Sequence, residues 1–154
     1  TINAFEHMRD PLLTLDNMYR SLEPGGLLLA HCPNYTVPLD VHFSILLVTR
    51  SKPLNGWLHR SKIARNPSVW DGLHFLRYID IRRHLQRRGF IFTFNTTILR
   101  DSISRLQDDP IFARRMPLPV RAIGGFLRST GLIRLLSRIP ARFQTPMEVL
   151  IRKP

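Results

Sequence analysis

The chain has 154 residues, a length typical of a single domain, and its 44% hydrophobic and 22% charged residues are close to globular averages, so wholesale disorder is excluded. One cysteine, Cys32, excludes an intrachain disulfide framework and fits a reducing compartment. No stretch of about 18 apolar residues is present, so no segment is expected to span a bilayer.

The net charge of +12 is concentrated in the second part of the chain. Residues 1–48 contain two basic and five acidic side chains, whereas residues 49–154 contain 21 basic and six acidic ones. Twenty of the 23 cations are Arg, which suits planar contacts with carboxylates or phosphates. This asymmetry indicates an anionic partner such as nucleic acid, phospholipid or a phosphorylated substrate, with a solvated Arg-rich surface as the alternative.

The first predicted helix begins at Asp10-Pro11, because Asp can cap free N–H groups and Pro suits the first helical position. Apolar residues then recur at helical spacing as far as Leu22. Residues 23–26, Glu-Pro-Gly-Gly, end the helix and turn the chain. Residues 27–32 form a continuous apolar run, which predicts a strand buried on both faces, as in a parallel sheet.

The next segment, residues 35–70, shows no clean period and is punctuated by prolines, which indicates an irregular insertion. Asp80 can cap a helix over residues 81–88, and Gly89 is well placed to end it. Residues 90–94 then predict a strand. Because a helix, a glycine turn and a strand occur twice in this order, the sequence predicts an α/β fold.

The last third of the chain is rich in Arg. Residues 111–143 contain seven Arg and no acid. Two short amphipathic helices are predicted there, over residues 120–128 and 132–139, each with Arg on one side and apolar residues on the other. Residues 147–152 predict a final strand.

Several of these segments together resemble the middle of a class I S-adenosylmethionine-dependent methyltransferase. The resemblance is carried by Asn3-Ala4-Phe5-Glu6-His7-Met8, Asp10-Pro11, Leu22-Glu23-Pro24-Gly25-Gly26, the apolar strand and Pro33-Asn34. Residues 78–90 resemble the helix and sixth strand of that domain, and residues 147–152 its returning seventh strand. The resemblance implies an α/β fold, namely the C-terminal half of a Rossmann-like sheet (strands four to seven), with residues 36–75 and 97–143 as largely helical cap insertions.

The departure from the family pattern is equally informative. The family's glycine-rich first loop and the acid that ends its second strand have no counterpart in these 154 residues. The resemblance therefore implies a partial methyltransferase domain over residues 1–154, in which the N-terminal cofactor-binding half is missing. We expect such a piece to have little affinity for the cofactor and little activity alone.

The resemblance places Asn3, Ala4, Phe5 and Glu6 beside the methionine end of S-adenosylmethionine, with His7 next to the reacting centre. His7 is the first candidate for a general base, because imidazole titrates near neutral pH, and packing or capping of the following helix is the alternative. Glu6 could instead orient His7 or contribute to a metal site. No metal site is predicted, because only Glu6 and His7 are adjacent and no ligand cluster is evident.

Asn34 and Tyr35 follow the first strand and are expected to hydrogen-bond the substrate at the same rim. The alternative is an Asn that forms a turn and a Tyr that packs half-buried. His42 is a second candidate for the base, because residues 38–43 resemble a substrate-loop segment of some family members in which an acid and His-Phe follow a Pro.

The expected substrate is a small or lipid-linked methyl acceptor. An anionic membrane surface is a further expected partner, because helices with all-Arg polar faces suit acidic headgroups, while a lid whose apolar faces bury against each other is the alternative. The second interpretation is a basic module that binds nucleic acid or a membrane surface without catalysis. Nucleic acid is the less favoured partner, since no helix-turn-helix, zinc or aromatic-platform signature is present. An inactive interaction protein that keeps half the fold is a third interpretation. The expected location is cytoplasmic, with peripheral membrane contact as an extension of it.

Overall fold

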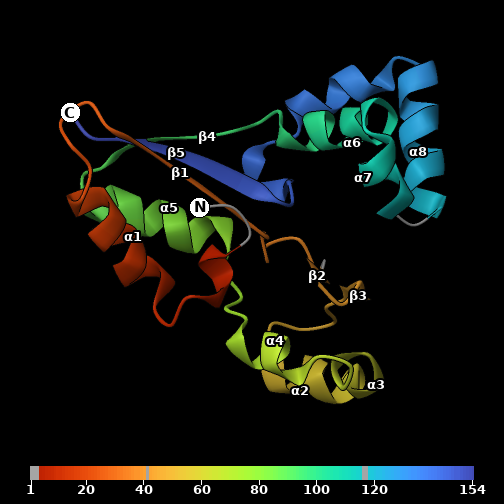
Figure 1. Cartoon of the computed structure of the whole chain (residues 1–154), viewed down its shortest axis with the longest axis horizontal. Helices are drawn as coiled ribbons and strands as arrows, with labels where there is room; N and C mark the ends of the chain where they lie inside the picture. The colour runs from red at the N-terminus through yellow and green to blue at the C-terminus, as the bar shows by residue number, and fades with distance from the viewer. Residues whose placement is uncertain (1–3, 41, 116–117) are drawn as a thin grey trace.

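The computed structural model describes residues 4–40, 42–115 and 118–154 and arranges them in three regions (Figure 1). A sheet with two helices packed against it forms the first region, which we call the sheet layer. Residues 36–75 form the second, the hairpin region, and residues 97–143 form the third, the helical region. The hairpin and helical regions lie at separate places beside the sheet layer (Figure 1).

The main sheet consists of β1 (Leu27–Cys32), β5 (Met147–Arg152) and β4 (Ile91–Phe94), in the order β1-β5-β4. β5 runs antiparallel to both neighbours, so that β1 and β4 run in the same direction on either side of it. The three segments expected to be strands are confirmed as strands, with bounds that agree to within one residue. They also lie side by side in one sheet.

The expectation that β1 is buried on both faces is wrong. Its burial alternates, with Leu28 and Cys32 buried and Leu27 exposed. Alternation is the usual pattern of a strand in an antiparallel pairing, and both sheets that the structure describes are antiparallel. The Rossmann-like arrangement implied by the resemblance stays a prediction. Its fourth strand would end at residues 1–3, outside the described residues.

Two helices, α1 (Pro11–Arg20) and α5 (Tyr78–Arg87), cover the buried face of the sheet. The side chain of Asp10 accepts a hydrogen bond from the backbone N–H of Leu13 at 3.0 Å, so α1 begins as its sequence predicts. The core contains these buried residues: Phe5, Leu15, Leu28, Ala30, Cys32, Leu76, Ile81, Leu85, Met147, Val149 and Ile151.

The start of α5 differs from the expectation by three residues. Asp80 accepts a hydrogen bond from the backbone N–H of Arg77 at 3.3 Å and ion-pairs with its guanidinium. Asp80 therefore lies inside the first turn of the helix, which begins at Tyr78, instead of capping a helix that begins after it. Gly89 follows the helix with a φ of +67°, a left-handed conformation that favours glycine.

A polar contact joins α1 to α5. His84 Nε2 lies 2.7 Å from Asp16 Oδ1, and the guanidinium of Arg88 pairs with the other carboxylate oxygen. Burial opposes ionisation of Asp16, but the hydrogen bonds and charges of His84 and Arg88 outweigh it and hold the pKa of Asp16 below its ordinary value.

The hairpin region is regular, contrary to the expectation of an irregular insertion. A short antiparallel hairpin, β2 (Leu39–Asp40) and β3 (Ile45–Leu46), is followed by three helices: α2 (Lys52–Leu58), α3 (Arg60–Ile63) and α4 (Pro67–Gly72). Pro53 and Pro67 stand in the first turns of α2 and α4, where a missing N–H is harmless. These two prolines therefore begin helices, whereas the sequence predicts that they interrupt regular structure. The region has its own buried cluster: Tyr35, Ile45, Leu47, Ile63, Trp70 and Leu73.

The helical region contains α6 (Ile98–Asp108), α7 (Pro110–Arg115), α8 (Leu118–Ser129), η2 (Leu132–Arg138) and η3 (Ala141–Phe143). The helix expected over residues 120–128 is confirmed within α8. The helix expected over residues 132–139 is present as the 3-10 helix η2, which ends at Arg138. Among the residues that the structure describes, no helix has both the length and the hydrophobicity to cross a membrane.

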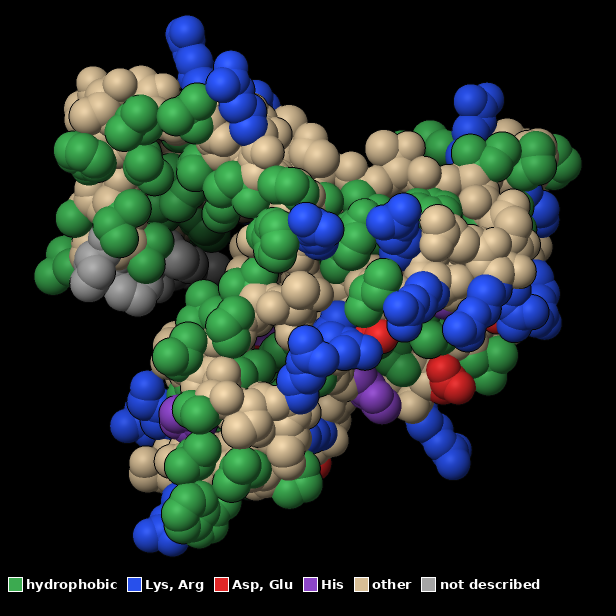
Figure 2. Space-filling model, turned by 180° about the vertical axis from the view of Figure 1, so that it is seen from behind, with side chains coloured by type: hydrophobic (Ala, Val, Ile, Leu, Met, Phe, Trp, Pro, Cys, Tyr) green, Lys and Arg blue, Asp and Glu red, His purple; other side chains and the backbone are tan. Residues whose placement is uncertain are grey.

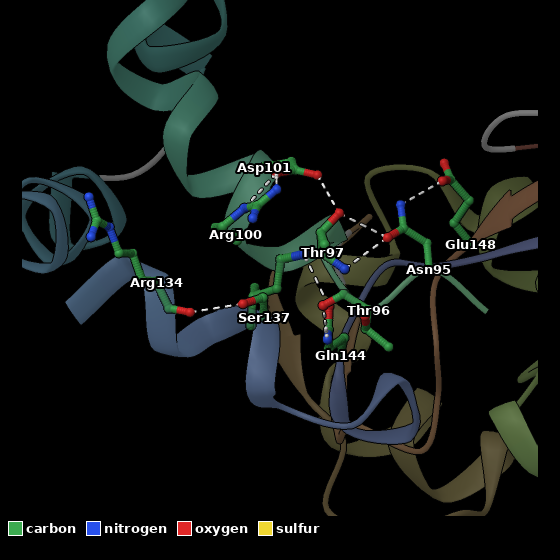
Figure 3. A network of polar contacts seen from close by, with 10 residues as sticks. Asn95, Thr96, Thr97, Arg100, Asp101, Arg134, Ser137, Gln144 and Glu148 are labelled. Atoms are coloured by element: carbon green, nitrogen blue, oxygen red, sulfur yellow. Dashed lines mark hydrogen bonds and ion pairs between the residues drawn. The ribbon is translucent and has the colours of Figure 1, made fainter. Parts of the chain in front are cut away.

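A polar network joins the helical region to the sheet (Figure 3). The fully buried Gln144 donates to Thr96 O at 2.7 Å, and its side-chain oxygen accepts from the N–H of Leu99, in the first turn of α6, at 3.2 Å. Asn95, just after β4, donates to Glu148 Oε1 on β5 at 2.8 Å (Figure 3). These bonds fix the position where the chain leaves the sheet and enters α6.

Candidate functional site

Glu6 and His7 lie on η1 (Phe5–His7), a single turn that precedes α1. The side chain of Phe5 is fully buried in the core of the sheet layer and anchors this turn. The backbone N–H of His74 donates to Glu6 O at 2.8 Å, which ties the turn to the segment after α4. The Glu6 carboxylate is thereby held inside the protein with 0% exposure.

His42 reaches the same place from the loop between β2 and β3. Its Nε2 lies 3.4 Å from Glu6 Oε1, and its Nδ1 lies 3.4 Å from Asp40 Oδ2. His7 approaches from the other side, with Nε2 3.8 Å from Glu6 Oε1 and its ring 5.2 Å from the His42 ring. We call Glu6, His7, Asp40 and His42 the carboxylate–histidine cluster.

Asp40 is held by groups behind it. The hydroxyl of Tyr35 donates to Asp40 Oδ2 at 2.7 Å, and the backbone N–H of Phe43 donates to Oδ1 at 2.8 Å. Tyr35 is itself buried and stacks on Phe75, with ring centroids 4.5 Å apart. Burial, followed by the charge of Asp40, raises the pKa of Tyr35, so its hydroxyl keeps the proton that it donates.

The charges in the cluster stabilise one another. The hydrogen bond to Asp40 and the nearby carboxylate of Glu6 raise the pKa of His42 to about 9, so the imidazole is protonated at neutral pH. Burial opposes ionisation of Glu6 and of Asp40, but the contacts with His42, joined by His7 at Glu6 and by Tyr35 and the Phe43 N–H at Asp40, outweigh it and lower the pKa of both. A protonated His42 cannot accept a proton, so of the two histidines His7 remains the candidate for a base.

Glu6 has unused capacity to accept hydrogen bonds. Both of its carboxylate oxygens are buried, and neither has a hydrogen-bond partner among the described residues. Its contacts are the longer ion-pair distances to His7 and His42. Because buried polar atoms in native proteins nearly always have a partner, this carboxylate is the feature of the cluster that most needs an explanation.

The predicted cofactor residues have different environments. Ala4 is exposed, Phe5 packs in the core, and Glu6 faces the two histidines. Asn3 lies outside the described residues. The geometry therefore favours an orienting role for Glu6, one of the alternatives left by the sequence, over contact with a cofactor amine.

Of the two residues predicted to bind the substrate, Asn34 has its side-chain amide hydrogen-bonded within the protein. It is fully buried, and its amide donates to Arg142 O and Gln144 O at 3.0 and 2.9 Å. Its Oδ1 accepts from the N–H groups of Thr36 and Tyr78, both at 3.0 Å. This side chain holds three segments together, so the geometry favours the structural alternative.

Two cavities of about 420 Å³ are lined by the hairpin region, and one of them is shared with the start of α5. One is lined in part by Tyr35, Arg50 and Arg77. The other, which we call the His42 cavity, is lined by His42, Phe43, Ser44, Lys62, Arg65 and Asn66. The sequence did not single out Lys62 or Arg65, because the residues around them resemble those around the other cations. Only the folded structure brings them near His42.

No family model matches the chain, and no solved structure matches it. It is similar to two uncharacterized proteins of Mycobacterium tuberculosis, one from strain CDC 1551 and one from strain H37Rv. Each is 27% identical over 164 residues, which cover 99% of this chain and 54% of the relative. The chain thus spans about half the length of the curated relatives it matches.

Proposed function

We propose that these residues form the part of an S-adenosylmethionine-dependent methyltransferase that holds the methyl acceptor. One observation carries the proposal: Glu6, His7 and His42 converge near the carboxyl end of β1. Glu6 lies close enough to Cys32, the last residue of β1, for its charge to act on the thiol: burial, together with this charge, raises the pKa of Cys32 to about 12. In open α/β sheets, ligands bind beyond the carboxyl ends of the strands.

The arrangement of the strands also supports the proposal. The resemblance assigns β1, β4 and β5 to the fifth, sixth and returning seventh strands. In the structure β5 does return antiparallel, between the other two. This support is limited to the described strands, which form a small antiparallel sheet.

The described residues fit only the reacting end of the cofactor. Ala4 is exposed beside η1, and the cluster follows it, but no glycine-rich loop is available to hold the rest of the molecule. When bound, the cofactor supplies a methyl group on a sulfonium. His7 is partly exposed, with Nε2 near Glu6, so it can accept a proton from an acceptor hydroxyl while Glu6 stabilises the resulting imidazolium.

The His42 cavity indicates the class of acceptor. Lys62 and Arg65 line it together with His42, which is also cationic at neutral pH. Three cations around one cavity favour an acceptor with a carboxylate or phosphate group. The phosphate of a lipid-linked acceptor has the same chemistry.

The test uses the longest reading frame that contains these residues. We expect saturable heat when it is titrated with S-adenosylmethionine in a calorimeter. His7→Ala should lower transfer of labelled methyl from S-adenosylmethionine to extracted metabolites by about 10²–10⁴-fold, the range for loss of a general base, with little change in cofactor affinity. His31→Ala, which removes a histidine paired with Glu148, is the control. The absence of cofactor binding in the wild-type protein would overturn the proposal.

A second candidate function is docking on an anionic membrane surface, and the exposure of apolar side chains in the helical region favours it. Ile123 and Phe126 on α8 are 57% and 60% exposed, and Leu135 on η2 is 47% exposed. Figure 2 shows hydrophobic side chains gathered over this region, with cations beside them. Because residues 111–143 contain seven Arg and no acid, the surface complements acidic headgroups.

The membrane proposal is tested by co-sedimentation with vesicles of phosphatidylcholine with and without phosphatidylglycerol. We expect binding only to the anionic vesicles and binding weaker by about 10- to 100-fold in Phe126→Ala, because a buried Phe contributes about 1.5–3 kcal/mol. Trp57→Ala, on α2, is the matched control, since Trp57 is 65% exposed in the hairpin region. An equal loss in Trp57→Ala contradicts the proposal, as does steeply salt-dependent binding to duplex DNA in place of vesicles.

A further inference from the structure

We infer that Glu6, His7 and His42 form a binding site for one divalent transition-metal ion, with Zn²⁺ as the best fit. Each residue offers one donor atom, and the three atoms lie within 4.8 Å of one another. Two imidazoles and a carboxylate are a donor set typical of zinc and its neighbours, whereas Mg²⁺ and Ca²⁺ prefer sets made of oxygen atoms.

The distances agree with such a site. In tetrahedral zinc coordination with bonds of about 2.0–2.2 Å, two donor atoms lie about 3.3–3.6 Å apart. His42 Nε2 is 3.4 Å from Glu6 Oε1, within this range, and His7 Nε2 is 3.8 Å from the same oxygen. The three donor atoms lie within 4.8 Å of one another, so His7, whose side chain is the more exposed of the two histidines, must move closer for all three to bond one ion.

The unpartnered carboxylate of Glu6 is the second, independent observation. It has 0% exposure, and both oxygens lack a hydrogen-bond donor among the described residues. A buried carboxylate is costly unless a cation compensates it, and without a metal only the His42 imidazolium, at 3.4 Å, does so. A metal ion between Glu6 and the two imidazoles would take the place of the His42 proton and give the carboxylate a direct partner.

The residues behind His42 suit a metal ligand. Asp40 Oδ2 lies 3.4 Å from His42 Nδ1 and is itself held by Tyr35 and by the backbone of Phe43. A carboxylate on one ring nitrogen fixes the orientation and tautomer of the ring, which leaves the other nitrogen, here Nε2, free to bind a metal. The Asp40–His42 pair therefore has the arrangement found around metal-binding histidines.

Three protein ligands leave at least one position open, as in catalytic zinc sites. His42 also lines the cavity that contains Lys62 and Arg65. An anionic oxygen that enters this cavity can reach the open position while its remaining charge meets the two cations. The inference concerns metal binding alone and is an alternative to the proposed methyl transfer, because a metal-bound His7 cannot accept a proton and a metal-bound His42 has lost its own.

The experiment is a calorimetric titration of chelator-treated protein with ZnCl₂, with CoCl₂ and visible absorption as a second probe of the ligand geometry. We expect one Zn²⁺ per chain and a tetrahedral Co²⁺ spectrum. Glu6→Gln and His42→Ala should each remove the saturable site, and Asp40→Asn should weaken it by about 10–100-fold, as is usual for a residue behind a ligand. Far-UV circular dichroism establishes that each variant is folded.

His31→Ala is the matched control, because His31 Nδ1 lies 3.3 Å from Glu148 Oε2 in a comparable histidine–carboxylate pair outside the cluster. It should bind Zn²⁺ as the wild type does. The inference is wrong if the wild-type protein shows no saturable binding, or if His31→Ala loses as much affinity as His42→Ala. Glu6→Gln preserves the size of the side chain and removes only its charge. If His42→Ala does not fold, the loss of Zn²⁺ binding in Glu6→Gln alone tests the inference.

Discussion

The sheet layer and the helical region differ in how far their apolar side chains are exposed to solvent. In the sheet layer, side chains from β1, β5, α1 and α5 form one cluster of buried residues. In the helical region, most of the large apolar side chains of α8 and η2 that the structure describes are exposed, and Leu106 is the hydrophobic residue of α6 that is buried. The first region is stabilised by its own packing, whereas the second has an apolar surface suited to contact with something else.

The largest expected effect is a core truncation in the sheet layer. Leu85, on α5, is fully buried, so Leu85→Ala should lower the free energy of unfolding by about 2–5 kcal/mol. Urea denaturation followed by circular dichroism measures the change. A loss as small as that of a surface substitution would show that the sheet layer is not packed as described.

The next effect concerns the connection between the two regions. Gln144→Ala removes the bonds to Thr96, Ile139 and Leu99 and should lower the free energy of unfolding by about 1–3 kcal/mol. Hydrogen exchange should rise in residues 98–139 and stay unchanged in β1 and β5. If exchange rises equally in the sheet, the two regions are one cooperative unit and the comparison fails.

A smaller effect is expected from the pair that joins α1 to α5. The pKa of Asp16 is lowered in the folded state, so its contribution to stability is complete above the ordinary Asp pKa of about 4 and is lost as the pH falls through the lowered value. Asp16→Asn should cost about 1 kcal/mol at neutral pH and flatten the acid limb of stability against pH. Thermal melts between neutral and acid pH check both expectations, and an unchanged acid limb in the variant would contradict them.

The smallest effect is expected in the helical region. Phe126→Ala should change the free energy of unfolding by less than about 0.5 kcal/mol, because the side chain is mostly exposed. Paired with Leu85→Ala in the same urea experiment, it measures the contrast between the two regions directly. A loss of about 3 kcal/mol or more, typical of a buried Phe, would place this side chain in a core and remove the contrast.

The sequence predicted the elements whose signals are local. The strands over residues 27–32 and 147–152 and the helix after Asp10 follow from apolar runs and a capping residue, and the structure contains them. The hairpin region was missed because Pro53 and Pro67 have two opposite local meanings, and neighbouring residues do not distinguish a helix start from a break.

The carboxylate–histidine cluster could likewise be predicted only in part from the sequence. Glu6, His7 and His42 were each singled out from the sequence, but the two histidines were alternative candidates for one base, and no contact between His42 and Glu6 was predicted. Their meeting depends on how the β2–β3 hairpin packs against η1, a contact between segments about 35 residues apart that no local pattern contains. The role of Asp40, which sets the charge of His42, could not be predicted for the same reason.

The single thiol of the chain gives the sheet layer a built-in reporter. Cys32 ends β1 with 1% exposure, and its pKa of about 12 keeps it in the unreactive thiol form at neutral pH. A thiol-labelling reagent can modify it only when the strand separates from its neighbours. The labelling rate of the unmodified protein therefore measures how often this sheet opens, with no engineered probe.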